Sequence, residues 1–243
     1  MKNTSLDTVR QLQQEVLSLQ GIKRPKEEQR SLTFGQLETA FYGKTFPVGF
    51  MHEFISSKPE SAAATTGFMT GLLSKITGPK GMCIWISTRR TIYPAALKLF
   101  GMAPDQVVFI DLTRHKDALW TIEEALKCEA VGAVVGEINE LSFTESRRLQ
   151  LAVEKSRVTG FIHRYRPRSE NTVACIAKWK ISPVQSITDG GMPGLGYPRW
   201  NVQLVKVRNG RPGSWDIEWS DNTFRYITRQ VFTISGSPKN KIA

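Results

Sequence analysis

Residues 53–66 have the outline of a phosphate-binding loop between a strand and a helix. A P-loop follows the pattern G-x-x-x-x-G-K and then Ser or Thr: glycines let backbone N–H groups face phosphate, lysine binds the terminal phosphates, and the hydroxyl binds Mg²⁺. Here Lys58 replaces the first glycine, Ala63 the second and Ala64 the lysine, so that only Thr65 fits. This favours a nucleotide-binding fold that no longer uses its nucleotide site. Taken alone, an ordinary turn and helix start explains the stretch equally well.

The charge of the chain gives a second indication, of the kind of partner. The 243 residues carry a formal net charge of +11, with a pI near 9.7. A surplus of this size favours a polyanion, most often nucleic acid, although charge supplies affinity rather than sequence specificity. The alternative is a basic protein without a polyanionic partner, and composition leaves both open.

Cysteine and histidine are sparse and dispersed, which argues against a metal centre or a disulfide framework. Cys83, Cys128 and Cys175 form no C-x-x-C pair and lie in apolar or helical surroundings, so we expect reduced packing residues, no metal and no cofactor. No run reaches the roughly 18 apolar residues of a membrane helix, and the first residues lack the apolar core of a secretory signal. The sequence thus predicts a cytoplasmic protein without a membrane partner.

The two ends of the chain are predicted to lie outside the main domain. Residues 1–22 read as an amphipathic helix arm, suited to dock on a partner and equally to fold back on its own core. Its candidate partner contacts are Leu6, Val9, Leu12 and Val16. Residues 23–31 are charged and predict a linker, residues 32–227 a core domain, and residues 228–243 a basic flexible tail.

The core domain alternates apolar runs with helical patterns. Runs such as 82–86 and 131–135 are typical of strands covered on both faces, and Ser142 and Glu145 form a capping box that opens a helix. This alternation predicts a mostly parallel sheet with helices on both faces. After residue 170 apolar residues recur at period two, with Asn209-Gly210 between two runs. That pattern predicts antiparallel strands and a C-terminal hairpin at one edge of the sheet.

A parallel sheet with an altered phosphate loop and a closing hairpin resembles the RecA fold, over about residues 32–227. Residues 47–66 are similar to the entry of the RecA nucleotide loop, with Pro59-Glu60-Ser61 and Thr65-Thr66 retained. More specific C-terminal motifs are Pro193-Gly194-Leu195-Gly196, Pro198-Arg199-Trp200, Gly210-Arg211-Pro212-Gly213-Ser214-Trp215 and Glu218-Trp219. These motifs resemble the ImuA family, RecA-like accessory proteins of bacterial SOS mutagenesis.

The resemblance implies that further parts of the ATPase machinery are missing. RecA-type enzymes carry a glutamate after the second strand to polarise the attacking water, and Arg89 occupies that position here. They also carry an aspartate at the end of a later strand to hold hydrated Mg²⁺; here Gly136 stands there, and Glu137 comes one residue late. Because such a shift turns a side chain to the opposite face, we expect Glu137 to be a poor substitute. With the lysine, three parts are lost, and we predict no ATP hydrolysis.

Two basic segments keep a resemblance to contacts that RecA-like proteins make. Residues 163–168 lie where RecA begins its second DNA-binding loop, with a tyrosine suited to stacking, although the loop here is much shorter. Residues 206–211 resemble the hairpin with which RecA-like helicases reach a neighbouring subunit's nucleotide; a solvated basic hairpin without a role is the alternative. The candidate contacts to DNA or an acidic partner are Arg164, Arg166, Arg168, Lys206, Arg208 and Arg211.

The resemblance implies a non-catalytic scaffold in error-prone translesion DNA synthesis and repair. Family members work with ImuB, an inactive relative of Y-family polymerases, and with an error-prone polymerase subunit of the replicative type. Contact with RecA and non-specific contact with DNA are further expectations. Two alternatives remain open: a SulA-like inhibitor of cell division, which shares the superfamily and lacks nucleotide machinery, and a divergent ATPase with a rebuilt site.

Overall fold

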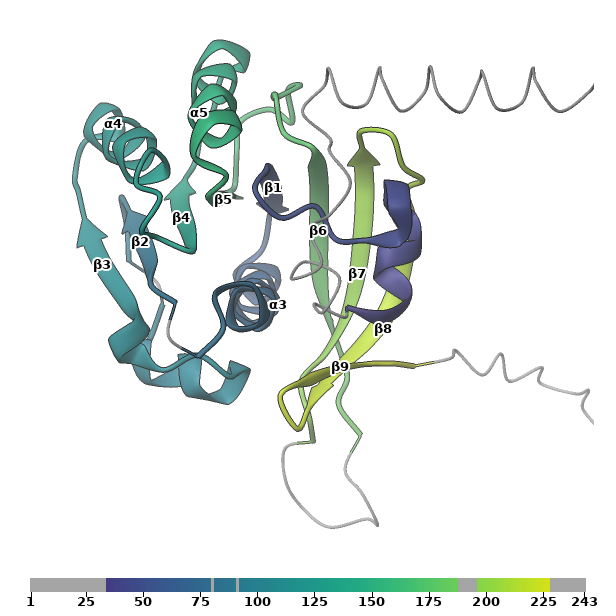
Figure 1. Cartoon of the computed structure of the whole chain (residues 1–243). Coiled ribbons are helices and arrows are strands. Elements are labelled where there is room, and N and C mark those ends of the chain that lie inside the picture. The colour runs from purple at the N-terminus through teal and green to yellow at the C-terminus, as the bar shows by residue number, and fades with distance from the viewer. Residues whose placement is uncertain (1–33, 80, 91, 188–195, 228–243) are drawn as a thin grey trace, which may run out of the picture.

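The computed structural model describes residues 34–79, 81–90, 92–187 and 196–227. Within these ranges the strands form one nine-stranded sheet in the order β3-β2-β4-β5-β1-β6-β7-β8-β9 (Figure 1). The predicted α/β architecture, a mostly parallel central sheet flanked by helices and followed by antiparallel strands, is confirmed. The predictions that lie outside the described residues are the helix arm 1–22, the linker 23–31, the tail 228–243 and residues 193–195 of the C-terminal motifs.

Six parallel strands form the part of the sheet that positions the candidate site. β1 lies between β5 and β6, and β2 lies between β3 and β4. β1 and β4 are buried along their whole length, as expected of strands that are covered on both faces. The parallel strands are β1 (Met51–Ser56), β2 (Cys83–Ser87), β3 (Val107–Asp111), β4 (Ala133–Ile138), β5 (Thr159–Tyr165) and β6 (Ala177–Val184).

Three further strands, β7 (Arg199–Val207), β8 (Gly213–Ser220) and β9 (Thr223–Tyr226), extend the sheet beyond β6 in antiparallel fashion. The prediction of antiparallel pairing throughout this part is wrong for one side of β6, which pairs parallel with β1 and antiparallel with β7. The period-two pattern reports which face of a strand is buried and says nothing of the direction of its neighbour.

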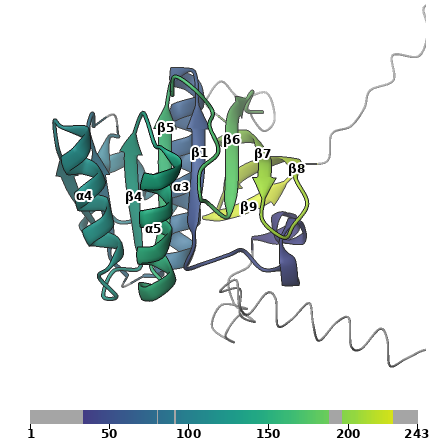
Figure 2. The ribbon, with the colours of Figure 1, turned by 90° about the horizontal axis from the view of Figure 1, so that it is seen from above.

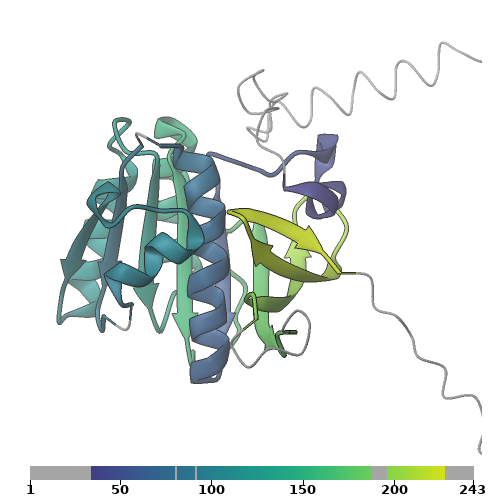
Figure 3. The same cartoon turned by 90° about the horizontal axis from the view of Figure 1, so that it is seen from below.

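Helices cover both faces of the sheet. α3 (Pro59–Thr77) crosses one face, whereas α4 (His115–Leu126) and α5 (Phe143–Ser156) cover the other (Figure 2, Figure 3). The predicted capping box of α5 is present: the Glu145 N–H donates to Ser142 Oγ at 3.2 Å, and the Ser142 N–H donates to the Glu145 carboxylate at 2.8 Å. Short 3-10 segments are η1 (Gly35–Ala40), η2 (Tyr42–Lys44), η3 (Pro94–Phe100) and η4 (Pro104–Gln106).

Each face of the sheet has its own hydrophobic core. The core under α3 is aromatic, with Phe54, Phe68 and Trp179 fully buried. Gly67 allows this packing, because a Cβ atom there would lie 2.8 Å from the ring of Phe100. The core under α4 and α5 is built mainly of isoleucine, leucine and valine. Among the described residues, no helix combines the length and apolar character needed to cross a membrane.

Candidate functional site

The residues compared above with a phosphate-binding loop fold as the beginning of α3. Only Ser57 and Lys58 connect the end of β1 to the helix. The Ala62 N–H donates a helical bond to the Lys58 carbonyl oxygen at 3.0 Å, and Lys58 has extended backbone, with φ −120° and ψ 154°. From Ala62 onward, the residues that align with the phosphate-binding pattern therefore direct their backbone N–H groups into helical bonds rather than around a phosphate.

A pocket of about 690 Å³ opens beside α3, at the carboxyl ends of β2, β4 and β5. One wall is a face of α3, where Ala62, Ala63 and Thr66 recur at helical spacing, and Ile92 and Phe100 belong to the segment that lines the pocket from the other side. Both walls are mainly apolar. The volume falls within the range of about 300–1,000 Å³ typical of small-molecule sites, and the carboxyl edge of a parallel sheet is where such sites occur.

Four polar side chains form a chain of buried contacts at the ends of the strands. The hydroxyl oxygens of Ser56 and Thr65 lie 2.9 Å apart, and His163 Nε2 lies 3.0 Å from Ser56 Oγ. His163 Nδ1 is 3.9 Å from Glu137 Oε1, and both of these side chains line the pocket. Thr65, the residue that still fits the phosphate-loop pattern, is fully buried and uses its hydroxyl in this chain.

Glu137 lies on the pocket side of the sheet, and the prediction that it would turn to the opposite face is wrong. It shares the face of Val135, which packs in the core under α3. Gly136 faces the other way, because a Cβ atom there would lie 2.4 Å from Ile122 of α4. The prediction took Gly136 as the position that faces the pocket, and the alternation of β4 places its neighbours there instead. Glu137 therefore supplies a carboxylate to the pocket.

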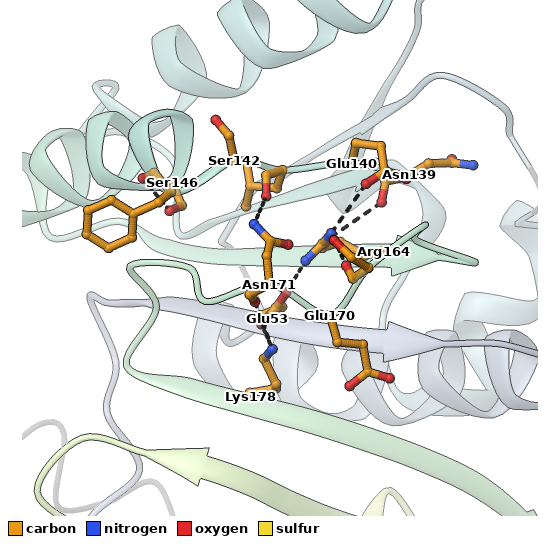
Figure 4. Close-up of polar contacts among 12 residues, drawn as sticks. Glu53, Asn139, Glu140, Ser142, Ser146, Arg164, Glu170, Asn171 and Lys178 are labelled. Carbon is orange, nitrogen blue, oxygen red and sulfur yellow. Dashed lines mark hydrogen bonds and ion pairs between the residues drawn. The ribbon is translucent and has the colours of Figure 1, made fainter.

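Arg164 is the centre of a buried ion-pair cluster on the opposite face (Figure 4). Its Nη1 group donates to Glu53 Oε1 at 2.7 Å, and both side chains are fully buried. Lys178 Nζ lies 3.2 Å from Glu53 Oε2, and Arg164 Nη2 lies 3.6 Å from Glu140 Oε2. The cluster thus balances two carboxylates with two cations, which is the arrangement that makes buried charge tolerable.

The same cluster holds the loop that follows β5. Arg164 Nη2 donates to the Ser169 carbonyl oxygen at 3.0 Å, and Lys178 Nζ donates to the Asn171 carbonyl oxygen at 3.2 Å (Figure 4). The Arg168 N–H donates to Glu140 Oε1 at 2.8 Å. These bonds engage backbone groups of the loop, so the charged cluster fixes the loop's path from β5 to β6.

The six predicted cationic contacts are not brought together. Arg164 cannot reach DNA or a partner at the surface because it is fully buried, and for this residue the prediction is corrected. Arg166 and Arg168 are exposed beyond the carboxyl end of β5. The other three lie at the opposite edge of the sheet, where Val207 aligns with Ala177 at the start of β6. These are Lys206, Arg208 and Arg211, of which Arg208 is half-buried.

Sequence reasoning missed His163 and the Ile92–Phe100 wall as parts of one site. The available signal was their position, since polar residues at the carboxyl ends of parallel strands meet at one edge of the sheet.

The expected packing role of the cysteines holds for Cys83, which is buried and whose pKa burial raises to about 12. It is wrong for Cys128, which is exposed.

No model of a known protein family matches the chain. The chain is similar to Protein ImuA of Caulobacter vibrioides, from strain NA1000 / CB15N and from strain ATCC 19089 / CIP 103742 / CB 15. In both cases the identity is 31%, with 77% of this chain and 82% of the relative covered. This identity over most of both chains shows that the chain belongs to the ImuA family.

Proposed function

We propose that this chain is a non-catalytic, cytoplasmic accessory protein of SOS mutagenesis, acting as a docking body in error-prone translesion DNA synthesis. The observation that carries the proposal is membership of the ImuA family. The family implies as partners an ImuB-like inactive Y-family polymerase and an error-prone polymerase subunit of the replicative type. RecA is a further proposed partner, with residues 1–22 as the contact segment.

The absence of ATP turnover is part of this proposal. Phosphoryl transfer depends on positioned cations, metal and water. Ala64 replaces the lysine, Arg89 replaces the water-polarising glutamate, and the loop itself is helical. Glu137 does place a carboxylate in the pocket, contrary to our expectation. Among the described residues that line the pocket there is no lysine and no phosphate-binding loop beside it.

Contact with DNA is proposed to be non-specific and to run through phosphates. Lys206 and Arg211 are exposed on the β7–β8 hairpin and form no ion pair within the described residues. Such cations add affinity that falls with salt and carry no base specificity. A titration of single-strand affinity against salt measures this directly: a slope near zero in log affinity against log salt would exclude phosphate contacts.

Deletion of the gene in its host tests the main proposal. The frequency of mutations induced by DNA damage should fall, and the full chain supplied in trans should restore it. Overproduction separates the alternatives, because filamentous cells point to a division inhibitor of the SulA type. An unchanged mutation frequency together with filamentation would reject the accessory role in favour of that alternative.

Two biochemical measurements complete the test. Purified protein should show no ATP turnover with or without single-stranded DNA, whereas turnover that Thr65→Ala abolishes would establish a rebuilt ATPase. Removal of residues 1–22 should weaken capture of RecA or self-association in a pulldown. Equal capture by the full and the shortened chain would remove this segment from the proposed interface.

A further inference from the structure

The pocket between α3 and η3 contains the buried carboxylate of Glu137, near the imidazole of His163. Glu137 is 8% exposed, lines the pocket, and neither of its carboxylate oxygens accepts a hydrogen bond from the described residues. The 3.9 Å to His163 Nδ1 exceeds hydrogen-bond length. Buried polar groups in native proteins are nearly always satisfied, so such a carboxylate in a pocket indicates a ligand with N–H or O–H donors.

The apolar and aromatic walls of the pocket favour a ligand whose main body is apolar and planar. Ala62 and Ala63 present only methyl groups from α3, and Ile92, Tyr93 and Phe100 line the pocket from the η3 side. Apolar and aromatic walls with a few polar groups are typical of pockets that hold an aromatic ring. A small hydrophilic ligand would leave these walls uncovered.

Two exposed arginines that line the pocket favour a ligand that carries negative charge. Arg89 lines the pocket, and within the described residues its side chain has no ion pair, whereas its neighbour Arg90 is engaged with Asp111 at 2.5 Å. Arg166 also lines the pocket; its Nε group donates to the Ser57 carbonyl oxygen at 3.2 Å, which leaves other guanidinium donors for a ligand. Guanidinium groups favour phosphate and disfavour a basic peptide.

We propose that this pocket binds one nucleotide unit, with its base inserted toward Glu137 and its phosphate outside at Arg89 and Arg166. A base combines flat faces for the apolar walls with N–H donors along one edge, and pockets that receive a base read that edge by hydrogen bonds. The orientation is the reverse of P-loop binding, in which phosphates occupy the start of the helix. The inference goes beyond the proposed function, because an accessory protein can act wholly through protein contacts.

The carboxylate also predicts which base is preferred. Guanine presents two adjacent donors, N1–H and N2–H, which match the two acceptor oxygens of Glu137, whereas thymine offers the single N3–H donor. The Glu137→Gln substitution keeps the size of the side chain but replaces one acceptor by a donor. It should therefore weaken guanine binding far more than thymine binding.

The test uses the full chain and three probes: dGMP, a five-nucleotide thymidine strand with one central guanine, and the all-thymidine strand. The guanine strand should bind more tightly than the thymidine strand, and Glu137→Gln should lower its affinity by roughly tenfold or more. Ala63→Trp should fill the pocket from an exposed position and abolish binding of both strands. The matched controls are Glu129→Gln and Ala95→Trp, at exposed positions outside the pocket, and both should bind as the parent chain does.

Thermal unfolding of each variant separates lost binding from lost folding. If dGMP binds as tightly as the guanine strand, the site takes free nucleotides; if only the strand binds, it takes single-stranded DNA, and both results support the proposal. Absence of binding to all three probes overturns it and leaves the pocket to a ligand of another class. Binding that Glu137→Gln and Ala63→Trp leave unchanged overturns it as well, by placing the nucleotide elsewhere on the basic surface.

Discussion

Arg164→Ala most directly tests whether Arg164 stabilises the fold from inside the protein rather than contacting DNA or a partner at the surface. It removes the guanidinium that faces Glu53 Oε1 at 2.7 Å, in a pair whose two side chains are fully buried. It also removes the donors to the carbonyl oxygens of Asn139 and Ser169, at 3.3 and 3.0 Å. The Glu53 carboxylate stays buried with Lys178 as its remaining cation.

Breaking a buried ion pair by removing one partner is destabilising by about 3–5 kcal/mol. For a domain of this size, each kcal/mol lowers the melting temperature by about 2–4 °C, so the expected fall is about 6–20 °C. We expect the lower part of this range, because Lys178 still compensates Glu53 in part. Urea unfolding followed by tryptophan fluorescence measures the change, since Trp85 and Trp179 are buried in the core.

The control is Arg168→Ala, because that side chain is exposed and only its backbone N–H binds Glu140. Its stability should stay within about 0.5 kcal/mol of the parent. A double variant, Glu53→Gln with Arg164→Met, should lose less stability than the sum of the two single losses, because it removes both charges of the Glu53–Arg164 pair together and leaves only Lys178 without its carboxylate. If Arg164→Ala lost less than about 1 kcal/mol while weakening DNA binding, the structural role argued for this residue would be refuted.

Three smaller predictions follow from other sites. Ser142→Ala should lower the free energy of unfolding by about 1 kcal/mol, because the α5 capping box is lost; an unchanged urea midpoint would contradict this. Gly49→Ala should lower it by about 1–3 kcal/mol, because φ is +77° there and a Cβ atom would lie 2.9 Å from the Arg157 carbonyl oxygen; a melting curve equal to the parent's would show that the backbone adapts. Burial lowers the pKa of His52 from 6.5 to about 4, so the neutral form is required in the fold. The unfolded chain then binds more protons between these values, and stability should be full above pH 6.5 and fall by up to about 3 kcal/mol as pH drops toward 4. His52→Gln should flatten this part of the pH profile, and a variant as sensitive as the parent would assign the effect to other groups.

The parallel core of the fold could be predicted from sequence because each signal there is local. Continuous apolar runs mark strands that are covered on both faces, and the capping box at Ser142 and Glu145 marks the start of α5 without reference to the rest of the chain. The parallel partner of β6 could not be predicted in this way. That pairing is set by where β1 lies in space, and the side-chain pattern of β6 is the same for both directions.

The candidate site was harder to predict, because a buried charged side chain pairs inside the protein, whereas an exposed one can contact a partner. Arg164, Arg166 and Arg168 look equivalent in sequence, yet the first points into an ion-pair cluster and the other two are exposed. What distinguishes Arg164 is its position near the end of β5, beside Glu53 on β1. The two side chains meet although they are 111 positions apart in the sequence. Glu137 was misplaced for a related reason, since one residue of offset in an assumed register exchanges the two faces of a strand.

The helical start of α3 has a consequence for how this lineage can change. A lysine at position 64 would add a charge without a phosphate-binding loop, because the backbone N–H groups from Ala62 onward are already bonded inside the helix. Glycines at positions 58 and 63 would be needed together: Ala63→Gly alone weakens the helix, and Lys58→Gly at the N-cap creates no binding loop by itself. Single substitutions toward such a loop therefore bring no phosphate binding on their own, and this sequence is several simultaneous changes away from a phosphate-binding loop.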